Sequence, residues 1–311
     1  MRSSSVERDG GISAGLRGGD TLLSVENLIV EFDVGKGKTF RAVDDVSFDV
    51  RAGETLGIVG ESGSGKSTTA KSIVQLPPPT SGEITYEKRG LDALGKDELR
   101  SLRTDIQMIF QDPVSALNPR RPVRDIIREG VDIWGTSQRW TESRLTELVE
   151  SVGIDPTSLD RKPFEFSGGQ CQRIGIARAL AVEPKVLICD EPTSALDVSV
   201  QSQILNLLHD LKAEHDLTML FISHDLAVVR NVSDRVMVMK EGRVVEIGAA
   251  DTIFENPGHE YTRTLLSAVP GSGVEIEHMQ TDTDVRRGVG TLMQLGPDHW
   301  VASGNSEKTR A

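Results

Sequence analysis

Short apolar runs alternate with helical patterns along most of the chain. Residues 56–59 form a run of the kind that is buried on both faces in a parallel sheet, and similar runs recur at 106–110, 186–189, 219–222 and 236–239. Between two of these runs, apolar residues at helical spacing predict a helix: Val200, Ile204, Leu207, Leu208 and Leu211. Strands that alternate with helices predict an α/β fold with a mainly parallel sheet.

Other parts of the chain depart from this pattern. Residues 23–32 and 43–50 alternate apolar and polar side chains, which is typical of strands. From Pro113 to Lys185 helical spacing replaces the strand-like runs, so we expect a helical subdomain at about 114–182, inserted in a main domain over 22–270. Residues 1–20 contain nine Gly or Ser, and only 12 of the 41 residues after Pro270 are apolar. We therefore expect a flexible leader over 1–21 and a small, partly disordered tail over 271–311.

Composition narrows the class of protein. The chain has 311 residues, and 35 Lys and Arg against 47 Asp and Glu give a formal charge of −12, which disfavours a dedicated nucleic-acid binder. No run approaches 18 apolar residues and the first residues lack an apolar signal stretch, so we expect neither a membrane-spanning helix nor secretion. Two cysteines are too few for a disulfide scaffold.

The clearest chemical signal is a glycine-rich stretch between the first buried run and a helical pattern. Backbone N–H groups of a G-x-x-x-x-G-K-[ST] loop cradle phosphates, and the positive end of the helix dipole adds to this. Here the loop consists of Gly60, Glu61, Ser62, Gly63, Ser64, Gly65, Lys66 and Ser67, with Thr68 opening the helical pattern. We expect Lys66 to reach the β- and γ-phosphates of a nucleoside triphosphate and Ser67 to bind Mg²⁺. A chance match is the alternative, which the flanking strand and helix disfavour.

Two further motifs lie later in the chain. Asp190 and Glu191 end a buried run, which places two carboxylates at the ligand edge of an open α/β sheet. Asp190 could orient the Mg²⁺ shell and Glu191 could polarise an attacking water. Ser167-Gly168-Gly169-Gln170 opens a helical pattern, and it is either a second anion-binding helix N-terminus or a simple helix cap.

In this order, and together with Gln111, Ser194–Asp197 and His224, these motifs resemble the ATPase subunit of ATP-binding-cassette (ABC) transporters over about residues 22–270. The resemblance implies a P-loop NTPase fold with a RecA-like core, an antiparallel β subdomain and a helical insertion. It also implies ATP and Mg²⁺ as ligands, with Ser67, Gln111 and Asp190 around the metal.

The resemblance assigns a role to each remaining motif. Two such subunits sandwich two ATP molecules, so the stretch Ser167–Gln170 would contact the γ-phosphate held by the partner's loop, and Asp197 would lie at the dimer seam. An aromatic residue stacks on the adenine, and Phe32 or Phe40 could supply it. The implied catalytic set is Glu191, His224, Gln111 and Lys66, in which Gln111 senses the metal and the water and His224 holds the γ-phosphate and Glu191 in register.

Two stretches indicate the kind of cassette. Residues 110–120 and 261–270 resemble segments of importers of oligopeptides, dipeptides, nickel and glutathione. Such an ATPase works with a second ATPase subunit, often a different chain, with two transmembrane permeases and with an extracellular binding protein. We therefore expect it at the cytoplasmic face of the membrane, with no nucleic-acid partner. The alternatives are a soluble cassette ATPase of DNA repair or translation, or a regulatory subunit without hydrolysis.

The end of the tail resembles that of the same importers. Ser303 stands where many members have a cysteine of an iron–sulfur site, and neither cysteine of this chain lies beyond residue 189. Because such a cluster needs thiolates, we expect none in this subunit.

Overall fold

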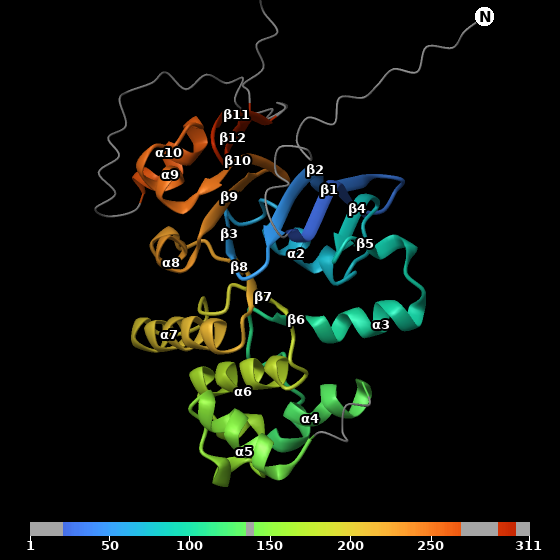
Figure 1. Ribbon diagram of the computed structural model, residues 1–311, viewed down its shortest axis with the longest axis vertical. Helices are drawn as coiled ribbons and strands as arrows, with labels where there is room; N and C mark the ends of the chain where they lie inside the picture. Colours follow the sequence, from blue (N-terminus) through green and yellow to red (C-terminus); the bar gives the residue numbers. More distant parts are fainter. Residues whose placement is uncertain (1–20, 135–139, 269–291, 303–311) are drawn as a thin grey trace, which may run out of the picture.

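The computed structural model describes residues 21–134, 140–268 and 292–302, which form two sheets (Figure 1). The smaller sheet is antiparallel, in the order β2-β1-β4-β5, and the larger has the order β11-β12-β10-β9-β3-β8-β7-β6. In the larger sheet β6, β7, β8, β3 and β9 run parallel. The strands are β1 (Thr21–Asp33), β2 (Thr39–Arg51), β3 (Thr55–Val59), β4 (Ser81–Tyr86), β5 (Arg89–Gly90), β6 (Ile106–Ile109), β7 (Val186–Asp190), β8 (Thr218–Ile222), β9 (Arg235–Lys240), β10 (Arg243–Ala249), β11 (Leu292–Gly296) and β12 (His299–Ala302).

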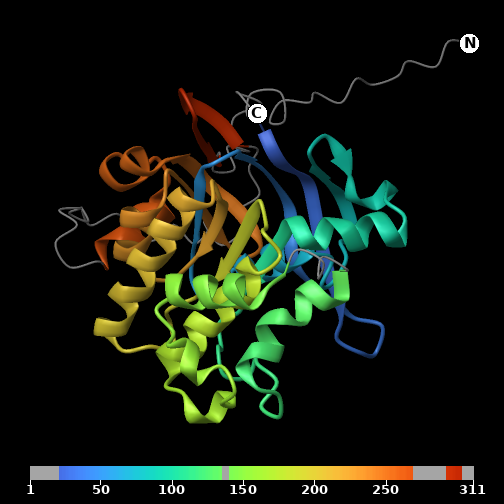
Figure 2. The same ribbon diagram turned by 60° about the horizontal axis from the view of Figure 1, so that its bottom comes forward.

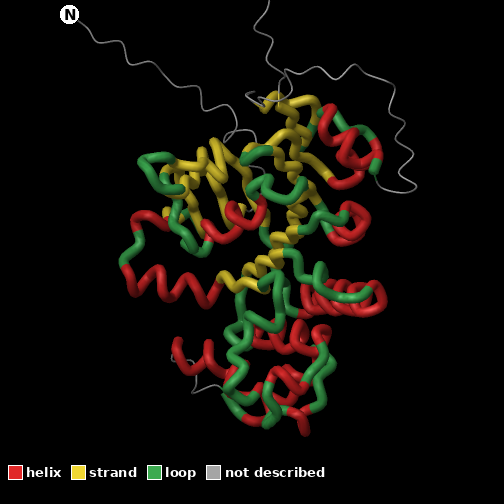
Figure 3. Tube along the Cα trace, turned by 180° about the vertical axis from the view of Figure 1, so that it is seen from behind, coloured by secondary structure: helices red, strands yellow, loops and turns green. Residues whose placement is uncertain are grey.

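The helices lie between the sheets and around the larger one. Helix α2 packs against both β1 and β2 of the small sheet and β7 and β8 of the large one. Figures 1 and 2 show α4, α5 and α6 together at one end of the molecule, and Figure 3 shows this end as helical while the strands fill the other. The helices are α2 (Lys66–Ile73), α3 (Lys96–Asp105), α4 (Val123–Trp134), α5 (Glu142–Ser151), α6 (Gly168–Leu180), α7 (Val198–Glu214), α8 (Leu226–Val232), α9 (Ala250–Glu255) and α10 (Glu260–Ser267).

The parallel strands are buried on both faces because each face has its own hydrophobic core. Ile188 and Leu220 belong to the core shared with α2 and the small sheet, whereas Leu187 and Phe221 belong to the core shared with the helices on the other side. This explains the uninterrupted apolar runs in the sequence. The expected α/β cassette fold, with an antiparallel β subdomain and a helical insertion, is confirmed.

A buried ion-pair network joins the two sheets. The Arg235 guanidinium at the start of β9 contacts Asp49 on β2 at 3.1 Å and Glu54 in the turn before β3 at 3.0 Å. All three side chains are buried or nearly so. Because removing one partner would leave a buried charge unpaired, losing any one of these three side chains should destabilise the protein by about 3–5 kcal/mol.

The C-terminal hairpin adds two strands to the edge of the large sheet. Strand β12 pairs antiparallel with β10, with Glu246 opposite Val301 and Ile247 opposite Trp300. Of the leader expected over 1–21, residues 1–20 lie outside the described residues, and Thr21 is the first residue of β1. The rest of the expected tail, including Ser303, also lies outside the described residues. Among the helices that the structure describes, none is long and apolar enough to cross a membrane.

Candidate functional site

The glycine-rich loop follows β3 and turns into α2 at the carboxyl end of the parallel strands. Gly60 and Gly65 have φ values of 151° and 99°, a region that favours glycine. A Cβ on Gly60 would lie 2.1 Å from the Met239 carbonyl oxygen, and one on Gly65 would lie 2.6 Å from that of Ala42. Both positions therefore require glycine, for conformation and for space.

The loop presents donors that suit an anion. The Lys66 ammonium is buried and donates to the carbonyl oxygens of Gly60 at 2.7 Å and of Glu61 at 2.9 Å. Burial lowers the pKa of Lys66, while the carboxylates of Glu191, Asp190 and Glu61 raise it. The Ser64 hydroxyl is buried without a hydrogen-bond partner among the described residues, an orphaned donor inside the loop. Buried donors around a glycine turn at the start of a helix fit phosphate oxygens.

A pair of oxygen donors lies beside the loop. The Ser67 hydroxyl donates to the Asp190 carboxylate at 2.6 Å, and Asp190 is 1% exposed. Lys71, one turn further along α2, contacts the other oxygen of Asp190 at 3.5 Å. A hydroxyl and one carboxylate are hard oxygen ligands of the kind Mg²⁺ prefers when substrate phosphates and water supply its other ligands. The donor set thus fits a Mg²⁺–triphosphate.

Gln111 and His224, from two other loops, both contact the Glu191 carboxylate. The Glu191 Oε2 accepts a hydrogen bond from Gln111 Nε2 at 3.1 Å and lies 3.2 Å from His224 Nδ1. Gln111 follows β6, Glu191 follows β7 and His224 follows β8, so the parallel register brings them to one edge. Glu191 also has a φ of 47°, which is uncommon for a residue with a side chain. A carboxylate held by two neighbours, next to Asp190, is placed to act on a water.

The stretch Ser167–Gln170 lies apart from the glycine-rich loop. The Ser167 hydroxyl accepts a hydrogen bond from the Gln170 N–H, and the Gln170 side chain accepts one from the Ser167 N–H. These two bonds form a capping box, so the stretch caps helix α6. Helix α6 packs against α4, α5 and α7, and no hydrogen bond within the described ranges joins this stretch to 60–67. A Cβ on Gly169 would lie 2.5 Å from Val200 Cγ1, so α6 meets α7 closely here.

Two other predicted contacts lie at the surface. Asp197 caps α7 by accepting from the Val200 N–H at 3.0 Å, and hydrogen bonds from Ser199 and Val200 lower its pKa. Phe32 and Phe40 lie directly opposite each other on β1 and β2, with exposed fractions of 40% and 56%. Both rings are available, and both remain candidates for the aromatic contact.

Sequence reasoning missed two residues that touch the site. Lys71 contacts Asp190, and the Tyr261 hydroxyl accepts a hydrogen bond from the Glu61 N–H at 3.2 Å. Lys71 follows Ser67 by four residues on α2, a spacing that places both side chains on one helix face and could have indicated Lys71. Nothing local could have indicated Tyr261, because it lies 200 residues from Glu61 in the chain.

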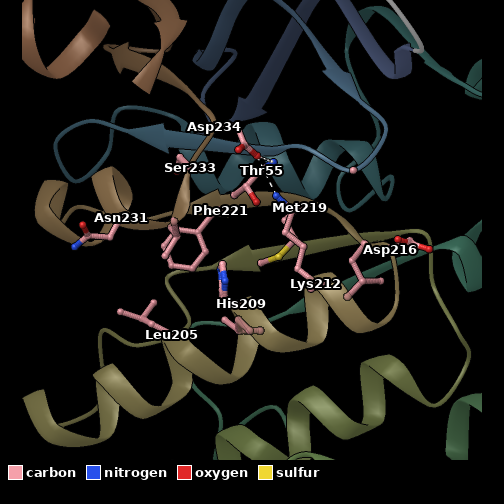
Figure 4. A pocket seen from close by; sticks show the side chains of 15 residues that line it. Thr55, Leu205, His209, Lys212, Asp216, Met219, Phe221, Asn231, Ser233 and Asp234 are labelled. Atoms are coloured by element: carbon pink, nitrogen blue, oxygen red, sulfur yellow. Dashed lines mark hydrogen bonds and ion pairs between the residues drawn. The ribbon is translucent and has the colours of Figure 1, made fainter. Parts of the chain in front are cut away.

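A cavity of about 370 Å³ lies elsewhere, at the opposite ends of the parallel strands. Figure 4 shows that Leu205 and His209 of α7, Thr55 of β3 and Phe221 of β8 surround it. None of the predicted site residues lines it. The residues predicted from the sequence therefore lie at the other ends of the strands, near the glycine-rich loop.

Comparison with known proteins shows which family this chain resembles. A model of the ABC transporter family matches residues 43–194. The oligopeptide transport ATP-binding protein OppF of Escherichia coli (strain K12) is 47% identical over 280 residues, which cover 87% of this chain and 84% of that protein. The dipeptide transport ATP-binding protein DppF of Lactococcus lactis subsp. cremoris (strain MG1363) is 43% identical over 296 residues, 92% of this chain and 95% of that protein. The solved dimeric structure of the ATP-binding cassette MJ0796, bound to ADP and Pi, has a TM-score of 0.66 at 30% identity, over 74% of this chain and 99% of that chain.

Proposed function

The chain belongs to the ABC transporter family, beside oligopeptide and dipeptide transport ATP-binding proteins, and on that premise we propose how its residues bind and hydrolyse ATP. It is the ATP-binding and ATP-hydrolysing subunit of a peptide importer. These relatives do not favour a cassette of DNA repair or translation.

In this proposal the loop Gly60–Ser67, with Thr68, holds the triphosphate. The buried Lys66 ammonium exchanges its two carbonyl partners for the β- and γ-phosphates, since a charge-assisted bond to phosphate is stronger than one to a neutral carbonyl. Ser67, Asp190 and Gln111 would hold Mg²⁺, which neutralises charge that develops on the phosphates. The Ser67–Asp190 contact supports this assignment because it already brings the two oxygens together.

Glu191 is the proposed general base, and its contacts with Gln111 and His224 carry the proposal. Two neighbours fix the orientation of its carboxylate, so it can accept a proton from water aligned with the γ-phosphate. His224, with 61% of its side chain exposed, is free to face a γ-phosphate as well as Glu191.

A second subunit would complete each ATP site. Because Ser167–Gln170 lies away from this chain's own loop, we propose that Ser167, Gly168 and Gly169 face the γ-phosphate bound by a partner, with Asp197 at the seam. The dimeric form of MJ0796 supports this arrangement. The partner is proposed to be a different ATPase chain, and Phe32 or Phe40 would stack on the adenine.

Two permeases would bind the ATPase dimer and couple its ATP hydrolysis to transport. Phe110 and Val114, where β6 leads into the helical insertion, are 38% and 51% exposed, and exposed apolar side chains there suit a partner helix. We propose that permease helices dock near Gln111–Arg120 at the cytoplasmic face of the membrane. An extracellular binding protein would deliver the peptide to the permeases.

The test is Glu191→Gln in the assembled transporter. Removing the base while keeping the side-chain size should lower ATP hydrolysis roughly 100- to 10,000-fold and leave nucleotide affinity within about twofold. Glu214→Gln, the same change at an exposed position on α7, is the matched control and should be unchanged. Wild-type turnover in Glu191→Gln would remove Glu191 from the mechanism.

A further inference from the structure

A tyrosine from the C-terminal part of the chain holds the phosphate-binding loop. Tyr261 on α10 is 6% exposed, and its hydroxyl oxygen accepts a hydrogen bond from the Glu61 N–H at 3.2 Å. The Lys240 ammonium lies 4.8 Å from the centre of its ring. Burial raises the pKa of the phenol, which therefore stays neutral at physiological pH.

The same peptide segment is held from its other side. The Glu61 carbonyl oxygen accepts from Lys66 Nζ at 2.9 Å, so both backbone polar groups of Glu61 are fixed by side chains. The Ser64 N–H also donates to the Glu61 carbonyl oxygen, at 3.1 Å, within the loop itself. If Lys66 turns to a bound phosphate, Tyr261 is the side chain that still anchors the backbone of Glu61, and it does so from outside the loop.

A buried carboxylate positions Tyr261. Glu246 on β10 is fully buried and accepts from the N–H groups of Gly258 at 2.6 Å and His259 at 3.0 Å. His259 in turn caps α10 by accepting from the Tyr261 N–H at 3.0 Å. Glu246 thus fixes the turn from which the helix with Tyr261 begins.

The C-terminal hairpin contacts the same carboxylate and the same turn. His299 Nε2 on β12 lies 2.7 Å from Glu246 Oε1, in a buried pair. A Cβ on Gly258 would lie 2.7 Å from Val301 Cγ2, which shows how closely the hairpin packs on the turn. A continuous series of contacts thus runs from the hairpin through Glu246 and the turn to Tyr261 and the loop.

We propose that Tyr261 is a positioning residue for the phosphate-binding loop, and that the C-terminal hairpin sets its position through Glu246. The loop is ordered for phosphate before ATP arrives, so ATP does not have to order it on binding. The inference rests on the proposed binding of phosphates by Gly60–Ser67. It adds a residue and a structural element to the ATP site that lie outside its sequence motifs.

The first test is Tyr261→Phe in the full chain, which removes the hydroxyl and keeps the ring. Two measurements are made: titration with a fluorescent ATP analogue, and deuterium exchange of the peptide that spans the loop without nucleotide. We expect about fivefold weaker affinity, the effect of one lost hydrogen bond, and faster exchange of the loop. In the assembled transporter the KM for ATP should rise while kcat stays within about twofold.

The second test addresses the hairpin. His299→Leu removes the group that contacts Glu246, and His299→Gln retains an N–H donor of similar reach. We expect His299→Leu to speed exchange of the loop and to weaken nucleotide affinity, and His299→Gln to restore both. Met293→Ala, on the same hairpin but 53% exposed, is the matched control and should behave as the wild type.

The outcomes separate the two proposals. If the wild type binds the analogue and Lys66→Ala does not, while Tyr261→Phe matches the wild type in affinity and exchange, the positioning role is wrong and the proposed ATP site stands. If the wild-type chain binds no nucleotide, the proposed ATP site itself is wrong. A change of melting temperature in His299→Leu without a change in loop exchange would overturn the role of the hairpin.

Discussion

Gly169→Ala should destabilise the protein and disable the stretch at the start of α6 that we propose faces a partner subunit. The added Cβ would lie 2.5 Å from Val200 Cγ1, whereas ordinary contact begins at 3.4 Å, so one group must move by about 0.9 Å. Val200 is β-branched and sits on α7, where its methyl groups have little rotational freedom. The strain must therefore move α6 relative to α7, which costs about 1–3 kcal/mol.

The same helix offers a matched control. A Cβ on Gly175 would have nothing within 4 Å, so Gly175→Ala should stabilise the protein by about 0.5–1 kcal/mol through helix propensity alone. The free energy of unfolding of both variants is measured by urea denaturation. Because Gly169 lies apart from the chain's own loop, Gly169→Ala should retain nucleotide affinity in the isolated chain and lose ATP hydrolysis in the assembled transporter. Equal stability of the two variants would refute the packing argument, and normal hydrolysis by Gly169→Ala would refute the role of the stretch.

Three further outcomes are expected. Lys66→Ala should weaken binding of a fluorescent ATP analogue by at least about tenfold, because two charge-assisted bonds to phosphate are lost; wild-type affinity would contradict the loop assignment. Burial, and after it the charges of Lys240 and Arg263, lower the pKa of His259 below its ordinary 6.5. The neutral ring therefore contributes to the free energy of unfolding above pH 6.5, and this contribution is lost as the pH falls through the lower pKa of the folded state. His259→Asn keeps a cap that does not titrate, so thermal melts at several pH values should show a smaller loss on acidification than in the wild type; equal losses would exclude His259. Iron and acid-labile sulfide analysis of the purified chain should find no stoichiometric cluster, and a stoichiometric one would refute the reasoning from Ser303.

The sequence predicted what is local. Buried strands, the loop and the acidic strand end were recognisable because a strand or a helix N-terminus imposes its own pattern on a few residues. The grouping of Gln111 and His224 with Glu191 was implied only by the resemblance to ABC ATPases. The structure brings the three together because the carboxyl ends of parallel strands share an edge.

Contacts between distant segments were beyond that reasoning. The hydrogen bond between Tyr261 and Glu61 depends on how α10 packs. The pairing of β12 with β10 joins two strands that are separated by two helices and a long connecting segment of the chain. Such outcomes depend on tertiary packing, and no short window of sequence records them.

The position of β3 in the sheet has a consequence for synthesis on the ribosome. Strand β3 lies between β8 and β9, which are made about 160 and about 180 residues after it. Pairing between strands so far apart in the sequence gives a high contact order, which slows folding. The nascent chain must therefore keep the apolar β3 unpaired until β8 leaves the exit tunnel, and keep one side of β3 unpaired until β9 follows. Chains cut short before that point should have no nucleotide site at all, and their unpaired strands make them targets for chaperones.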